Sequence, residues 1–71
     1  MDNADNPVEE VRRAAGLSFL GLSEATGIPR TTLKRKLGNL SAFTVGELET
    51  IARACEADAD DLILTVMRQV A

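Results

Sequence analysis

The sequence contains no histidine, tryptophan or tyrosine, and Cys55 is its only cysteine among 71 residues. Without histidine, the chain lacks the commonest acid–base and metal-ligating side chain. A single cysteine excludes an internal disulfide and a cysteine-based zinc site, and it favours a cytoplasmic location. We expect Cys55 to be a small core residue, and a reactive or bridging thiol is the alternative.

Strand patterns and long apolar runs are also missing. The only aromatic residues are two phenylalanines, and β-branched residues nowhere alternate with polar ones over a useful length. No apolar run approaches the eighteen or so residues of a membrane span, and no signal peptide pattern is present, so we expect no membrane association. The abundant aliphatic residues predict one small all-α domain, which dimerisation would help to stabilise.

Catalytic constellations cannot be assembled from these residues. There is no nucleophile with a partner base and no phosphate-cradling glycine loop, so we predict no enzyme and no catalytic residue. The acidic residues near position 60 lack the regular spacing of a metal-binding loop. We therefore predict no metal site and no cofactor, and no small-molecule ligand is evident.

Charge is unevenly distributed along the chain. The formal net charge is −3 and the isoelectric point is near 4.7, which argues against a protein that simply coats nucleic acid. Residues 1–10 carry a charge of −4 and residues 41–61 a charge of −5, whereas residues 28–40 carry +4. The positive segment is therefore expected to meet an anion, while the acidic remainder weakens non-specific binding.

Residues 18–37 form the most informative stretch and read as two short helices joined at Gly27. Ser18 suits the N-cap of the first, over 19–26, and Gly27 allows the left-handed turn that ends it. Pro29 suits the first turn of the second helix because its φ is preset and it has no N–H. The residues expected to face the core from this second part are Ile28, Leu33 and Leu37.

The outer face of that second helix is polar and positive. On a wheel of about 100° per residue, Thr31, Lys34 and Arg35 lie opposite the leucines. Residues 18–37 resemble the helix-turn-helix of phage Cro and repressor proteins and of Xre-like bacterial regulators. The small residues, the turn glycine and the Thr-Thr-Leu-Lys-Arg run all fall in register.

The resemblance extends over residues 8–70. It implies a compact five-helix, lambda-repressor-like DNA-binding domain with the helix-turn-helix at helices 2 and 3. We assign this domain to residues 7–71, after a polar, acidic leader over 1–6 that we expect to be disordered. Residues 44–54 and 58–70 fit the fourth and fifth helices.

The resemblance also implies that the second motif helix enters the major groove of duplex DNA. We predict base contacts by Arg30 and Arg35, which can pair bidentately with guanine, and by Thr31 and Lys34. The residues predicted to contact phosphates are Ser18, Thr32, Lys36, Asn39, Ser41 and Thr44. Turn and cap duties are the alternative for the last three residues, and a merely solvated helix face is the alternative for residues 30–36.

The first helix is expected to begin with Asn6 as its cap and Pro7 in its first position, and to end at Gly16. The residues expected to face the core are Val8, Val11 and Ala15. Arg12 and Arg13 lie off this stripe. We interpret them as solvated surface charges, and a phosphate contact from the flank of the motif is the alternative.

The fourth helix should start at a capping box formed by Thr44 and Glu47. Its predicted buried stripe consists of Val45, Leu48, Ile51, Ala52 and Cys55. The family that this chain resembles often closes this helix with glycine, whereas Glu56 and Ala57 stand there in this sequence. The resemblance therefore implies a positive φ at one of these two residues, and a different junction is the alternative. Asp58 then caps the fifth helix.

The fifth helix is too apolar for a single face. Leu62, Val66 and Val70 are expected to face the domain, and further apolar residues broaden the stripe. The predicted dimer interface consists of Ile63, Leu64, Met67 and Val70. A fully internal helix that closes the core is the alternative.

These patterns favour a sequence-specific transcriptional regulator, a Cro-like or phage-type repressor in the cytoplasm of a bacterium or infected host. It would bind a pseudo-palindromic double-stranded DNA operator as a homodimer and act by occlusion. The alternative is a protein-interaction module, such as an antirepressor or antitoxin, that uses its acidic fourth and fifth helices. The low isoelectric point is the main support for that alternative.

Overall fold

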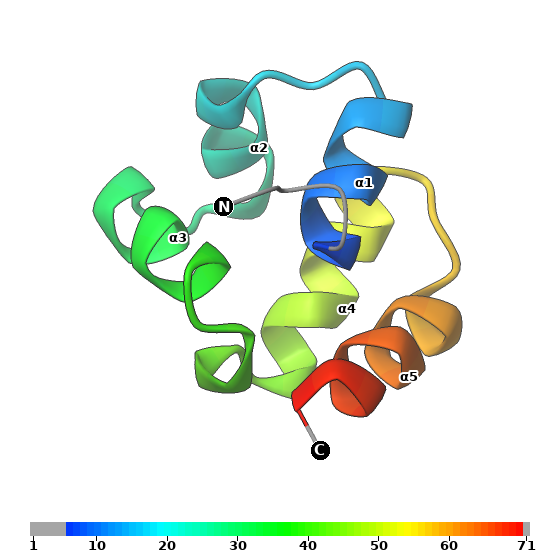
Figure 1. The fold of residues 1–71 in the computed structure, drawn as a ribbon. Coiled ribbons are helices and arrows are strands. Elements are labelled where there is room, and N and C mark those ends of the chain that lie inside the picture. Colours follow the sequence, from blue (N-terminus) through cyan, green and yellow to red (C-terminus); the bar gives the residue numbers. More distant parts are fainter. Residues whose placement is uncertain (1–5, 71) are drawn as a thin grey trace.

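All regular structure within residues 6–70, which the structure describes, is helical, as the composition predicts. The structure is a computed structural model. The elements in chain order are α1 (Pro7–Ala14), α2 (Phe19–Thr26), α3 (Arg30–Leu37), the 3₁₀ turn η2 (Leu40–Ala42), α4 (Val45–Ala54) and α5 (Ala59–Val70). Figure 1 shows α4 near the centre, with α2 and α3 to one side and α5 to the other. Residues 1–5 of the leader that we predict to be disordered lie outside the described residues. The prediction is wrong for Asn6, whose side chain caps α1 and bonds to the Leu37 carbonyl oxygen.

Four of the five α-helices begin at a polar side chain that caps them. Asn6 Oδ1 accepts from the N–H groups of α1 at 3.0 and 3.2 Å, and Ser18 Oγ accepts from Gly21 N at 2.9 Å. Thr44 opens α4 with a complete capping box, and Asp58 Oδ1 accepts from Asp61 N at 3.1 Å. The predicted caps are therefore confirmed. They can be predicted from sequence because each joins residues only two or three positions apart.

Three connections use left-handed backbone. Gly16 and Gly27 follow α1 and α2 with φ of 73° and 77°, where glycine has no steric penalty. Glu56 follows α4 with φ of 55°, and it is the only non-glycine residue with positive φ among residues 6–70. The predicted strain after α4 is confirmed at Glu56, at a cost of about 1–2 kcal/mol for an L-residue.

The core between the helices is aliphatic apart from one phenylalanine. Its buried residues are Val8, Leu22, Ile28, Leu33, Phe43, Leu48, Ile51, Ala52, Cys55, Leu62 and Val66. Every α-helix contributes to this cluster. The prediction that Cys55 is a core residue is confirmed, and its burial raises the pKa of the thiol.

Three residues predicted to face the core do not do so. Ala15 is exposed, and Val45 and Val70 are 55% and 43% exposed. All three lie at helix ends: Ala15 follows the last residue of α1, Val45 opens α4 and Val70 closes α5. The helical repeat continues to the end of each helix, but the neighbouring core does not extend that far.

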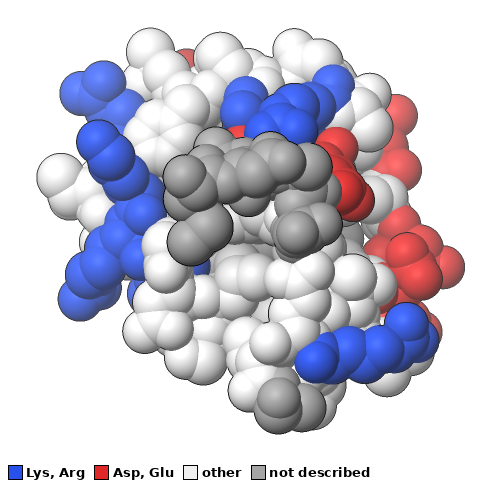
Figure 2. Space-filling view, in the orientation of Figure 1, with Lys and Arg blue, Asp and Glu red and all other residues white. Residues whose placement is uncertain are grey.

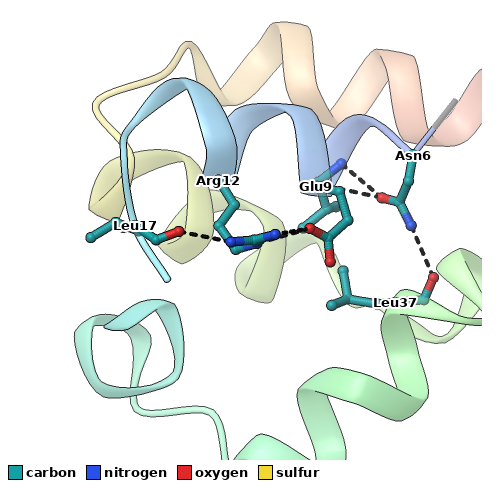
Figure 3. Close-up of polar contacts among 6 residues, drawn as sticks. Asn6, Glu9, Arg12, Leu17 and Leu37 are labelled. Atoms are coloured by element: carbon teal, nitrogen blue, oxygen red, sulfur yellow. Dashed lines mark hydrogen bonds and ion pairs between the residues drawn. The ribbon is translucent and has the colours of Figure 1, made fainter. Parts of the chain in front are cut away.

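Arg12 is not a solvated surface charge, contrary to the prediction. Its side chain is only 19% exposed, and its Nε and Nη2 donate to Glu9 Oε1 at 2.8 and 2.5 Å. Its Nη1 also donates to the carbonyl oxygen of Leu17 at 2.8 Å (Figure 3). Arg12 therefore joins α1 to the start of the α1–α2 connection, whereas Arg13 is exposed as predicted.

None of the helices within residues 6–70 combines the length and apolar character needed to cross a membrane.

Candidate nucleic-acid interface

The α2–α3 pair is built around the turn at residues 27–29. Ser23 is 9% exposed, and its Oγ donates to the carbonyl oxygen of Ile28 at 2.6 Å. This buried bond ties the last turn of α2 to the turn between the two helices, and Ile28 fills the core as predicted. Pro29 occupies the N-cap position of α3, not its first turn, and its ψ of 145° keeps it extended as the chain turns into the helix.

Two side-chain contacts hold the other end of α3. Asn6 Nδ2 donates to the carbonyl oxygen of Leu37 at 3.0 Å, so the cap of α1 also reaches the last residue of α3 (Figure 3). Lys36 Nζ donates to the Glu47 carboxylate of α4. Leu33 is the one buried side chain of α3. The helix is thus fixed at both ends, which leaves its outer face free.

The outer face of α3 presents the four residues predicted to contact bases. Arg30, Thr31, Lys34 and Arg35 are all exposed. No hydrogen bond or ion pair joins the three cationic side chains to another residue within 6–70. In Figure 2 blue side chains line the left edge of the molecule, where α3 lies in Figure 1, and smaller blue groups lie at the top and at the lower right.

The cations of α3 are not all placed where the helix itself favours them. Arg30 lies in the first turn, at the positive end of the helix dipole, and Arg30 and Lys34 are like charges at i and i+4, so each effect costs a few tenths of a kcal/mol. Lys34 and Arg35 lie in the last turn, where the dipole favours positive charge. No acidic residue lies in α3. An exposed, unpaired row of cations of this kind is suited to a polyanionic ligand.

The residues predicted to contact phosphates differ in how free they are. Ser18 and Thr44 accept hydrogen bonds as caps, which leaves each hydroxyl hydrogen free to donate. Ser41 Oγ donates to Asn39 Oδ1 at 2.7 Å, and the amide hydrogens of Asn39 remain available. These four residues are exposed and Thr32 is half-buried.

Lys36 differs from that group because its charge is already paired. Its side chain is only 14% exposed, against the Glu47 carboxylate. Sequence reasoning missed this pair, since Glu47 was already assigned to the capping box and the two residues are eleven positions apart. The available signal was a lysine at the end of one helix and an acid in the first turn of the next.

Acidic residues gather away from α3. Asp60 and Asp61 lie in the first turn of α5, next to its cap Asp58, and Figure 2 shows red side chains on the edge opposite the blue ones. Within residues 6–70, no group of three or more acidic or cysteine residues is arranged to hold a metal ion. The molecule therefore has a cationic edge and an acidic edge.

The outer side of α5 is apolar. Leu64, Met67 and Val70 are 53%, 55% and 43% exposed, whereas Ile63 is half-buried and packs against the core. The three exposed residues recur at spacings of three, so they share one side of the helix. They provide an apolar strip on a surface that is otherwise polar along α5.

Comparisons of the chain with protein-family models, with curated proteins and with solved structures find no match. The features that bear on its function are therefore the cationic face of α3, the acidic edge, the apolar strip of α5 and the pattern at residues 18–37.

Proposed function

We propose that this protein is a sequence-specific, double-stranded DNA-binding transcriptional regulator, a Cro-like or phage-type repressor that inserts α3 into the major groove. The observation that carries the proposal is the exposed cationic face of α3, whose three cationic side chains have no hydrogen-bond or ion-pair partner within residues 6–70. The resemblance of residues 18–37 to a helix-turn-helix specifies the ligand as duplex DNA.

Each exposed side chain of α3 has a chemical role in this proposal. Arg30 and Arg35 pair bidentately with guanine O6 and N7, and each good pair contributes about 1–3 kcal/mol of discrimination. Thr31 contacts a thymine methyl group or a base edge, and Lys34 binds a base or a phosphate. The residues that contact the phosphates of the DNA backbone beside α3 are Ser18, Thr32, Asn39, Ser41 and Thr44. Bound in this way, the protein would occlude the operator.

A homodimer formed through α5 would give the operator its symmetry. The exposed strip of Leu64, Met67 and Val70 supports this, because small monomers seldom leave such side chains in water. The half-sites of an inverted repeat lie about 34 Å apart, one turn of DNA, so a two-fold dimer would have to present its two α3 helices at that spacing.

The acidic edge favours one second candidate, a helix-turn-helix protein that binds another protein, as an antirepressor or antitoxin does. In that case α4 and α5, which carry most of the acidic residues after position 40, would form the binding surface. Salt-sensitive binding to a defined duplex would favour the repressor, because only phosphate contacts release counterions.

The proposal is tested by selecting bound duplexes from a random library at moderate salt, with wild type, Arg35→Ala and the control Arg53→Ala in parallel. Arg53 is an exposed arginine of α4, so it matches the charge change away from both α3 and the α5 strip. We expect an inverted repeat, with specificity relaxed at one symmetric pair of positions in Arg35→Ala only. If dimeric wild-type protein enriches no sequence, the operator proposal is wrong.

A further inference from the structure

The Lys36–Glu47 pair connects α3 to α4 across the η2 turn. Lys36 Nζ donates to both carboxylate oxygens of Glu47, at 2.7 and 2.6 Å. The two side chains are only 14% and 24% exposed. Because both side chains are partly buried, the pair is screened less than a fully exposed ion pair.

The capping box with Thr44 holds Glu47 in place independently of Lys36. Its Oε1 accepts from the backbone N–H of Thr44 at 2.9 Å, and its own N–H donates to Thr44 Oγ1 at 3.1 Å. This capping box fixes the carboxylate relative to the α4 axis. The Lys36 ammonium and the Thr44 N–H together hold the pKa of Glu47 below its ordinary value. The carboxylate is therefore a preorganised anchor and not a mobile surface group.

The other restraints on α3 are the buried Leu33, the packing of Leu37 and the bond from Asn6 Nδ2 to the Leu37 carbonyl oxygen. The helix has eight residues and no side-chain cap, its main backbone neighbours are α2 and η2, and Lys36 provides its ion pair to α4. Lys36 directly follows Arg35 in the last turn, so a rotation of α3 that broke the Lys36 contact would also move Arg35. Bidentate recognition tolerates displacements of only about 0.5 Å.

We propose that Glu47 is a positioning residue for DNA reading: through Lys36 it fixes the orientation of α3, and Lys36 links two helices instead of binding phosphate. This inference rests on the proposed function, and it assigns Lys36 a different role from the phosphate contact that the sequence predicts. Glu47 acts through Lys36 and touches no base.

The two roles of Lys36 give opposite results. If Lys36 binds phosphate, Glu47→Gln frees the ammonium and tightens binding, and Lys36→Met lowers the slope of log K against log salt by about one. If Lys36 links the helices, both variants weaken binding to the selected duplex by a similar factor, about tenfold, and the slope is unchanged. The double variant is then no weaker than either single one.

The experiment measures fluorescence anisotropy of wild type, Lys36→Met, Glu47→Gln and the double variant on the selected duplex and on a scrambled one. The control is Glu49→Gln, an exposed acid of the same helix, which gives the same change in net charge. Temperatures are chosen at which circular dichroism shows every variant fully folded. A role in stability alone would then leave the ratio between selected and scrambled duplexes unchanged, whereas positioning lowers it.

Amide spectra of the free protein test the positioning without DNA. We expect ¹⁵N–¹H shifts throughout α3 in Glu47→Gln and none there in Glu49→Gln. Unchanged α3 amides in Glu47→Gln overturn the inference, and so does tighter DNA binding by that variant. If wild type binds no duplex, the proposed function fails, and the α3 amides alone decide whether Glu47 orients the helix.

Discussion

Replacing Ser23 with alanine should destabilise the α2–α3 pair more than its small change in volume suggests. Ser23 Oγ donates to the Ile28 carbonyl at 2.6 Å in a buried position, and this is the only hydrogen bond to that oxygen within residues 6–70. A buried acceptor left without a partner costs about 1–3 kcal/mol. For a domain of this size, each kcal/mol lowers Tm by about 4–8 °C, so we expect a fall of about 10 °C.

The assay is thermal and urea unfolding followed by circular dichroism, with Ser41→Ala as the matched control. Ser41 is exposed and its hydroxyl bonds to exposed Asn39, so this substitution should change the free energy of unfolding by less than about 0.5 kcal/mol. If Ser23→Ala is as stable as wild type, the Ile28 carbonyl does not depend on Ser23, and our account of how the turn is held is incorrect.

Three further outcomes follow from the structure. Glu56→Gly should stabilise the protein by about 0.5–1 kcal/mol in urea unfolding, because the positive-φ penalty that it removes, about 1–2 kcal/mol, exceeds the opposing cost of about 0.5–1 kcal/mol from the greater backbone entropy of the unfolded chain; a loss of stability would contradict this. The hydrogen bond from Lys36 holds the pKa of Glu47 below its ordinary value of 4.5. A carboxyl with a lowered folded-state pKa stabilises the fold above its unfolded pKa and loses this effect as pH falls through the folded value. The Tm difference between wild type and Glu47→Gln should therefore be largest near neutral pH and disappear in acid; a difference that persists in acid would show that ionisation is not its source. Met67→Lys should shift sedimentation from dimer to monomer while Glu49→Lys does not, and a wild type that remains monomeric at high concentration would rule out the α5 contact.

Local features of the fold could be predicted from the sequence. Asn6, Ser18, Thr44 and Asp58 each cap a helix where expected, because a cap depends on residues only a few positions apart. The left-handed backbone after α4 was also expected, because the resemblance implies it at a place where this chain has Glu56 and Ala57 and no glycine. Such features require no knowledge of how the helices pack.

Long-range features could not be predicted in the same way. Helical periodicity placed Val45 in the core, but Val45 is the first residue of α4 and its side chain is exposed there. The same pattern placed Arg12 in water, whereas the path of the α1–α2 connection brings the Leu17 carbonyl to its guanidinium. The Lys36–Glu47 pair likewise depends on how far η2 turns the chain between two helices. In the last two cases the outcome depends on the path of a connecting segment that has no regular sequence pattern.

The arrangement of α3 separates the residues that hold the helix from the residues that would read DNA. Leu33, Lys36 and Leu37 make the contacts to the rest of the domain, whereas Arg30, Thr31 and Arg35 are exposed. A short helix without a side-chain cap or balancing acids has little stability of its own, so its conformation depends on the first set. Substitutions in the second set can then change the sequence that is read with little effect on folding. Because packing and side-chain anchors hold the helix, the exposed cations take no part in its contacts to the domain and remain available to a ligand.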